Sequence, residues 1–176
     1  IVISHNHKFN LFILGDREKP ASPGLAALAE DANTTELADE LDATGSVYDY
    51  NEASGPIVPG SSVTIQIRTK RKFQRISAAG MLVTSNDAFF AVRGVYARSW
   101  TTVLVDAKAY DSGTERNSEN CDYIPGPPCE NGGVRDTAGA EGYVYVHSGI
   151  HGIDDLEPAD FDWRNPVATI MVRRVK

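Results

Sequence analysis

The sequence predicts an all-β fold, an antiparallel β-sandwich with one or two short helices in an N-terminal insertion. From Gly55 onward, short β-patterned runs alternate with clusters of Gly, Pro, Asn and Asp, which is typical of a sandwich. The only helical pattern precedes them, within residues 23–42. The 176 residues suffice for one core and are too few for two, so we expect a single domain over 1–176.

Composition excludes several classes of function. Hydrophobic residues make up 41% and charged residues 23% of the chain, which is ordinary globular usage and argues against disorder. The net charge of −7 argues against nucleic acid as a partner, because that binding needs Lys and Arg to neutralise phosphates. No apolar run approaches the roughly 20 residues of a membrane span.

The N-terminal part begins with an expected first strand or edge strand over 8–14, which ends at Gly15. Pro23 stands where a first helical turn tolerates proline, so a short helix should begin there. Thr34 is the expected N-cap of a second helical piece. The apolar positions that should face the sheet are Leu25, Leu28 and Ala29 in the first piece and Leu37 and Leu41 in the second.

The remaining strands follow from period-two patterns. Residues 62–68 alternate cleanly, with Val63, Ile65 and Ile67 expected to point inward. Further strands are expected over 76–84, 89–95, 101–110, 143–147 and 167–172. The stretch 111–142 is the longest connection without a regular pattern, and loops of that length are usually functional or pinned.

Cys121 and Cys129 enclose a proline-rich segment that is too stiff to form a helix. We predict a disulfide between them, which would pin the long loop and implies an oxidising compartment. Two separate buried thiols are the alternative. A zinc site would need two further ligands, and none lies nearby in the sequence.

Oxygen-bearing side chains gather at the end of the strand expected over 101–110. Asp111 and Glu115 flank a glycine, with Asn117 close behind, and such a loop can wrap around a hard cation. Asp87 follows another expected strand. If the two strands run in the same direction, all three carboxylates meet at one end of the sandwich and would repel unless a cation neutralised them. The alternative is a solvated acidic turn.

The histidines, a second acidic segment and Trp163 are better explained by structural roles than by catalysis or metal binding. The four histidines, His5, His7, His147 and His151, lack zinc-protease spacing, and hydrogen-bonded structural rings are the favoured interpretation. An acidic segment could supply the paired carboxylates of a hydrolase. A solvated acidic loop is the favoured interpretation of this segment. Its acidic residues are Asp154, Asp155, Glu157, Asp160 and Asp162. Trp163 is expected to anchor the entry to the last strand.

Several motifs, in order along nearly the whole chain, resemble the spondin amino-terminal (F-spondin) domain in its bacterial secreted form. The matching pieces are Asn10–Phe12, Ala21–Asp31, Met81–Val83, Asn86–Phe89, Tyr110–Glu115, Ile124–Cys129, Gly149–Gly152 and Asp162–Ala168.

The resemblance implies a β-sandwich with one calcium-type ion at its end. The family's metal ligands fall on Asp87, Asp111 and Glu115, the same residues that the spacing indicated. Two departures matter. Glu115 stands where animal members carry Asp, and the thrombospondin-type repeats of those members are not found in this chain. The resemblance therefore implies the integrin and matrix binding of animal members only weakly for this chain.

The function expected from the sequence is a secreted or cell-surface Ca²⁺-binding adhesion or interaction module, not an enzyme. Its partner would be extracellular matrix, a cell-surface protein or a glycan. The alternatives are a secreted hydrolase that uses the acidic loops, and a purely structural domain of a larger cell-surface protein.

Overall fold

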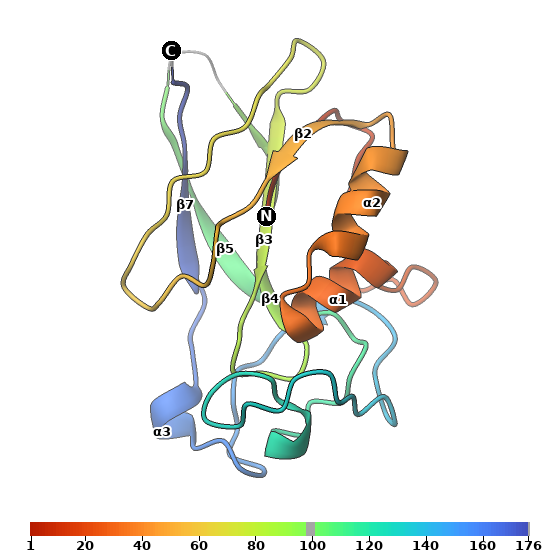
Figure 1. Cartoon of the computed structure of the whole chain (residues 1–176), viewed down its shortest axis with the longest axis vertical. Coiled ribbons are helices and arrows are strands. Elements are labelled where there is room, and N and C mark those ends of the chain that lie inside the picture. The colour runs from red at the N-terminus through yellow and green to blue at the C-terminus, as the bar shows by residue number, and fades with distance from the viewer. Residues whose placement is uncertain (98–100, 176) are drawn as a thin grey trace.

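The computed structural model describes residues 1–97 and 101–175. It confirms the expected all-β antiparallel fold, as an open seven-stranded sheet with few helices (Figure 1). The strands are β1 (Val2–His5), β2 (Val47–Asn51), β3 (Arg75–Met81), β4 (Ala88–Tyr96), β5 (Val103–Asp111), β6 (Tyr145–Val146) and β7 (Ala168–Val172).

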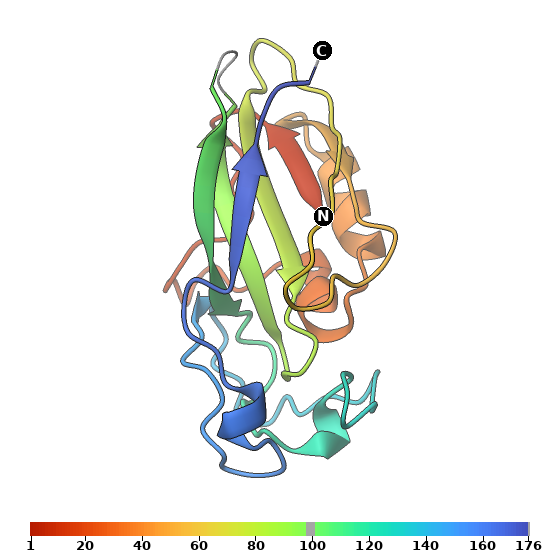
Figure 2. The same cartoon turned by 90° about the vertical axis from the view of Figure 1, so that its left-hand side faces the viewer.

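The main path of the sheet runs β2-β1-β3-β4-β5-β6, and β7 pairs with β5 off this path. Strand β5 is therefore shared: its last residues, Tyr110 and Asp111, pair with β6, and its first five pair with β7. The β5–β7 ribbon packs against the second face of the sheet through a cluster around Ala78, Val92 and Ala107, which makes the fold sandwich-like (Figure 2).

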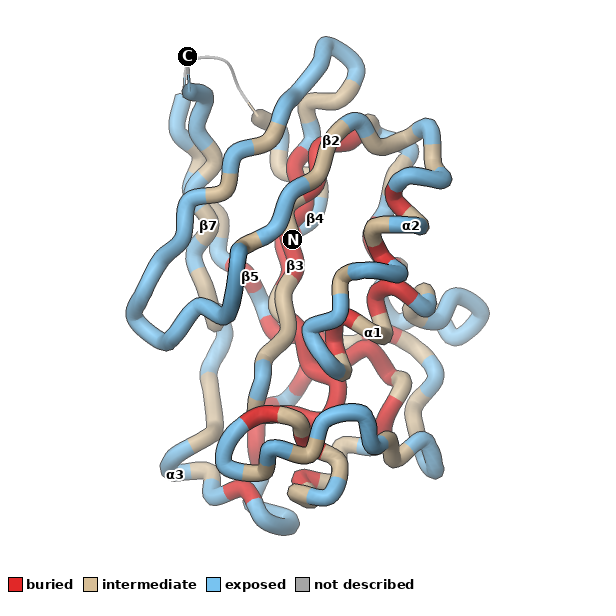
Figure 3. Tube along the Cα trace, in the orientation of Figure 1, coloured by how far each residue is buried: buried red, intermediate tan, exposed pale blue. Residues whose placement is uncertain are grey.

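Two helices, α1 (Pro23–Asp31) and α2 (Thr35–Ala43), lie over the first face of the sheet. The main core between them and the strands holds Ile3, Leu25, Leu28, Leu37 and Phe89, among others, and all five are fully or almost fully buried. Figure 3 shows this buried zone, whereas the segment between β2 and β3 is largely exposed.

Local chemistry explains where the helices begin and how closely they pack. Ser22 caps α1 by accepting a hydrogen bond from the Leu25 amide at 3.2 Å, as N-cap serines do. Only glycine fits at position 24, because a Cβ there would lie 2.4 Å from the Cα of Leu37. Thr34 is the N-cap of α2 by position, but its hydroxyl donates to Glu52 instead of capping the helix.

Two expected strands are wrong. Residues 8–14 form a loop whose Leu11 and Phe12 are buried in the main core, so their apolar character reflects packing and not a strand. Residues 62–68 also form no strand: Val63 is 46% exposed, and the segment is held to β2 mainly through side chains. The Arg68 amide donates to the Asp49 carboxylate, and Asn51 donates to the Gln66 carbonyl.

The expectation that all helices lie within 23–42 is also wrong. Helix α2 ends at Ala43, and a third short helix, α3 (Pro158–Phe161), begins at a proline that follows Glu157. The other five expected strands fall where the period-two patterns predicted them, with shifted ends, whereas β1 and β2 were not expected from the sequence. No helix in the described residues is long and apolar enough to cross a membrane.

The long connection after β5 folds against the end of the sheet as irregular loops (Figures 1 and 2). The predicted disulfide between Cys121 and Cys129 is confirmed, and a short 3-10 turn over Cys121–Tyr123 begins at its first cysteine. A small apolar cluster of Ile124, Ile150 and Leu156 lies beneath it, with Trp163 packed against the cluster. The loop region thus has its own fixed core.

Candidate functional site: buried carboxylates at the end of the sheet

The site forms where the β3–β4 turn meets the end of β5. Asp87 is the last residue of that turn, and Asp111 is the last residue of β5. Ala88 pairs directly with Asp111 in the β4–β5 ladder, and the Ser112 amide donates to the Asp87 carbonyl at 3.2 Å. This register brings two carboxylates from distant parts of the sequence together in a fully buried position.

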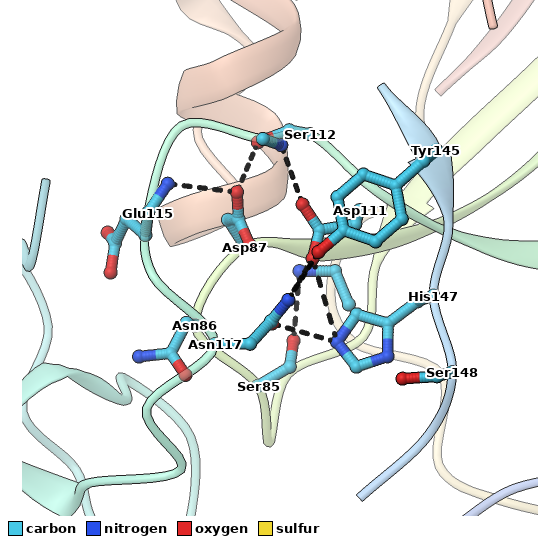
Figure 4. Close-up of polar contacts among 12 residues, drawn as sticks. Ser85, Asn86, Asp87, Asp111, Ser112, Glu115, Asn117, Tyr145, His147 and Ser148 are labelled. Atoms are coloured by element: carbon cyan, nitrogen blue, oxygen red, sulfur yellow. Dashed lines mark hydrogen bonds and ion pairs between the residues drawn. The ribbon is translucent and has the colours of Figure 1, made fainter. Parts of the chain in front are cut away.

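One oxygen of Asp87 is surrounded by hydrogen-bond donors from the loop after β5. Its Oδ2 accepts from the Ser112 hydroxyl at 2.8 Å and from the Glu115 amide at 3.1 Å (Figure 4). It also accepts from the Thr114 amide at 2.8 Å. Successive backbone amides of this kind form an anion-binding concavity. The other oxygen, Oδ1, is buried and has no hydrogen-bond partner among the described residues.

Asp111 is held from the opposite side. Its Oδ1 accepts from the Gly113 amide at 2.7 Å, and its Oδ2 accepts from the Asn117 amide group at 2.5 Å. Asn117 also donates to the Tyr145 hydroxyl at 2.7 Å, and its Oδ1 lies 3.0 Å from His147 Nε2. Asp111 is thus fixed by a polar network that extends into β6 and the residues after it.

The tautomer of His147 follows from this network. The Gly149 amide donates to Nδ1 at 3.0 Å, so the neutral ring carries its proton on Nε2 and donates to Asn117. Burial lowers the pKa of His147 to about 4, which keeps the ring neutral at ordinary pH. Asp111 therefore has no cationic histidine to balance its charge, although its Oδ2 is 3.9 Å from His147 Nε2.

Glu115 contributes its backbone to Asp87, but its side chain extends away from the Asp87–Asp111 pair (Figure 4). Its Oε1 lies 3.2 Å from Nε of Arg135, which also forms ion pairs with Glu30 and Asp31 at the end of α1. The contact with Arg135 lacks hydrogen-bond geometry. Both carboxylate oxygens of Glu115 are consequently buried without a hydrogen-bond donor in the described part of the chain.

The electrostatics of the site disfavour three negative charges. Burial raises the pKa of Asp87, and burial together with the charge of Asp87 raises the pKa of Asp111 to about 8. Burial also raises the pKa of Glu115 to about 8, against the opposing effect of Arg135. Buried carboxylates of this kind take up protons or bind a cation.

Glycine permits the tight wrapping of this loop. Gly113 has a φ of +72°, in the left-handed region, and a Cβ there would lie 2.3 Å from the Tyr143 carbonyl oxygen. The Gly142 amide donates to the Gly113 carbonyl at 2.9 Å. The loop after β5 is thereby pressed against the chain that leads into β6.

The sequence-predicted site residues are only partly brought together. Asp87 and Asp111 meet as expected, and Asn117 contacts Asp111. The Glu115 carboxylate lies beside Arg135 instead. Among residues 1–97 and 101–175, no group of three or more His, Cys, Asp or Glu side chains is arranged to hold a metal ion.

The remaining histidines and acidic residues lie in separate environments. His5 is buried beside Ser77, and His151 bonds the Ser148 hydroxyl. The acidic segment at 154–162 holds neighbouring loops: Asp155 accepts from the Cys121 amide at 2.8 Å, and Asp162 from the Ile150 amide at 3.0 Å.

Sequence reasoning missed several residues that shape the site. Ser112 and Thr114 supply donors to Asp87, and Arg135, 20 residues further along the chain, lies beside the Glu115 carboxylate. Glu119 was also missed. It is 4% exposed, and its carboxylate accepts from the amides of His151, Gly152 and Ile153 at 2.6–2.9 Å. The density of Ser, Thr and Gly around Asp111 was the one available signal.

When the chain is compared with protein-family models and with curated proteins, no family model matches and no curated protein gives a significant match.

Proposed function

We propose that the chain is an extracellular Ca²⁺-binding adhesion or interaction module of the spondin-domain type. The observation that carries the proposal is the buried pair Asp87 and Asp111, in which Asp87 Oδ1 has no hydrogen-bond partner in the described residues. A buried, unpaired carboxylate oxygen is costly unless a proton or a cation compensates it. The resemblance of the Asn86–Phe89 and Tyr110–Glu115 motifs to the family's ligand positions supports the same residues.

The donor set fits a hard divalent cation. Asp87 and Asp111 would hold the ion, and Glu115, whose carboxylate lies beside Arg135, would have to leave that contact to supply a third carboxylate. All these donors are oxygens, which suits Ca²⁺ or Mg²⁺ over zinc or copper. Irregular loops tolerate the flexible coordination of Ca²⁺, whereas Mg²⁺ demands near-octahedral geometry.

The ion would supply positive charge where two ionised carboxylates meet. Hydrogen bonds within the chain orient the two carboxylates: Ser112 and the amides of the 112–115 loop orient Asp87, and Asn117 orients Asp111. Neutralising the pair would hold the 112–115 loop against the β3–β4 turn. The loops at this end of the sheet would then present a stable surface to matrix, a cell-surface protein or a glycan.

Calorimetric titration of the chelator-treated protein with Ca²⁺, Mg²⁺ and Zn²⁺ tests this proposal. We expect one Ca²⁺ to bind with a dissociation constant on the order of 10⁻⁴–10⁻³ M, as extracellular modules do. Asp111→Asn should abolish binding, while Asp39→Asn, which changes an exposed carboxylate on α2, should leave it unchanged. Binding that persists equally in both variants would contradict the assignment.

A binding array separates an interaction module from a purely structural domain. Matrix proteins and glycans would be presented to the protein with calcium and with excess chelator. Calcium-dependent capture of a defined component supports the interaction role. Calcium binding without capture of any component would leave the ion with a stabilising role and would contradict the interaction role.

A further inference from the structure

A second concave feature lies along the sheet where β4 and β5 separate. The β4–β5 ladder runs from Ala88–Asp111 to Ala91–Lys108, although β4 continues to Tyr96 and β5 begins at Val103. The first part of β5 pairs with β7 instead. A groove of about 440 Å³ follows this divergence, between the two strands and the loop that carries Phe9 and Leu11.

This groove concentrates positive charge in an acidic protein. Three basic side chains line it, Arg75, Arg93 and Lys108, together with His5 and His7. Among the described residues, Asp106 supplies the only carboxylate of the lining, and its Oδ1 accepts a hydrogen bond from Thr169. The net charge of the chain is −7, so the basic lining of the groove is opposite in sign to the charge of the chain as a whole.

The three basic side chains of the groove lack a carboxylate partner in the part of the chain that the structure describes. Within residues 1–97 and 101–175, none of these three side chains forms an ion pair, whereas Arg68, Arg135 and Arg164 each pair with an acid. A cation without an internal partner keeps its capacity to bind an external anion.

The two guanidinium groups are nevertheless held in place. Arg93 lies over the Phe12 ring, with its Cζ 4.2 Å from the ring centroid, and its Nη1 donates to the Phe12 carbonyl at 3.0 Å. Arg75 Nη1 donates to the Gly94 carbonyl at 3.1 Å. A guanidinium has five N–H donors, so most remain for a ligand. Holding them beforehand lowers the entropic cost of binding.

The groove also has fixed polar and aromatic parts. His5 Nε2 lies 2.8 Å from the Ser77 hydroxyl, which accepts from the Gly94 amide at 3.0 Å. The ring of Phe9 packs against His5 in a tilted arrangement, with centroids 4.9 Å apart, and it is only partly buried. An apolar ring beside anchored cations suits a ligand that is itself a ring bearing a negative charge.

We propose that this groove binds an acidic sugar, one or two rings carrying a carboxylate or sulfate group. Arg75, Arg93 and Lys108 would bind the anionic group, and Phe9 would pack against a sugar ring. The strand edges that face each other without a ladder would offer backbone groups to hydroxyls. The volume falls within the range of about 300–1,000 Å³ typical of small-molecule sites. This site is separate from the Asp87–Asp111 pair and does not depend on the ion.

Calorimetry in excess chelator tests the proposal, so failure of the calcium site cannot affect the result. The probes are a glucuronate-containing disaccharide, a neutral disaccharide of equal length, inorganic sulfate and inositol trisphosphate. We expect the acidic disaccharide to bind most tightly. Equal affinity for the neutral sugar would overturn the charge recognition, and equal affinity for sulfate would leave only a general anion site. Tighter binding of the inositol phosphate would overturn the sugar assignment.

Matched variants locate the site. Lys108→Gln and Arg75→Gln change exposed side chains and should each weaken binding about tenfold, the effect of losing one charge-assisted hydrogen bond. Arg173→Gln removes an exposed charge outside the groove and should leave affinity unchanged. Unaltered binding in both groove variants would overturn the proposal.

Discussion

Asp87 and Asp111 lie beside each other because Ala88, the residue after the first, pairs with the second across β4 and β5. The Ser112 amide then bonds the Asp87 carbonyl, and the Ser112 hydroxyl bonds the Asp87 carboxylate. Backbone register therefore forces two acids into one buried position. That arrangement costs stability when both are ionised, and its charge is the basis of the proposed cation site.

The first prediction concerns pH. Without a cation, the folded state holds Asp111 with a pKa of about 8, above its ordinary value of 3.8, and Asp87 and Glu115 shift in the same direction. The folded state then binds more protons than the unfolded state between these values, so stability should fall as pH rises through this window. Melting curves in chelator between about pH 5 and pH 8 should show a falling melting temperature.

Two comparisons make the pH prediction specific. Asp111→Asn should flatten the decline, because it removes one raised pKa, whereas Asp39→Asn on the exposed side of α2 should preserve the decline. Millimolar Ca²⁺ should also reduce the decline, since it favours the ionised pair. A melting temperature that rises with pH in chelator would contradict the account.

A second prediction uses two glycines with similar backbones. Gly133 has a φ of +80° and open space where a Cβ would lie, so Gly133→Ala should cost only about 1 kcal/mol for the left-handed conformation. At Gly113 the added Cβ would also collide with the Tyr143 carbonyl. Gly113→Ala should cost about 1–3 kcal/mol more than the control, measured by denaturant unfolding. Equal losses would show that the 112–115 loop packs less tightly than described.

The third prediction concerns the disulfide. The Cys121–Cys129 bond closes a loop with a sequence separation of 8 residues. On the chain-entropy model, the double variant Cys121→Ser/Cys129→Ser should lose about 2–3 kcal/mol of unfolding free energy. A reductant should destabilise the wild-type protein by a similar amount and leave the variant unchanged. A wild-type unfolding midpoint that ignores reductant would contradict this.

The sequence predicted well where local pattern and burial agree. The alternation in 89–95 and 101–110 corresponds to central strands, and the position of Asp111 at the end of the second run located half of the site. The disulfide was predicted because Cys121 and Cys129 are close in sequence and the proline-rich segment between them is too stiff to form a helix. In both cases, the residues that form the sequence pattern are the same residues that form the strand or the disulfide in the structure.

The failures share a different cause. Residues 62–68 alternate as a strand does, yet they bond β2 through Asp49 and Asn51 side chains, which no pattern within the segment reveals. The direction of the Glu115 side chain depends on Arg135 and on the end of α1, both remote in sequence. The groove beside Lys108 arises where β5 changes partner from β4 to β7, and strand pairing of that kind is a property of the whole fold.

The most direct test of the central claim is an anomalous difference map from crystals of the protein grown in millimolar calcium. The account predicts one calcium peak in contact with Asp87 Oδ1, the buried oxygen that lacks a partner in the described residues, and with the Asp111 carboxylate. Crystals of Asp111→Asn grown in the same way should lack this peak. A wild-type map without anomalous density beside these two carboxylates would contradict the assignment of the site.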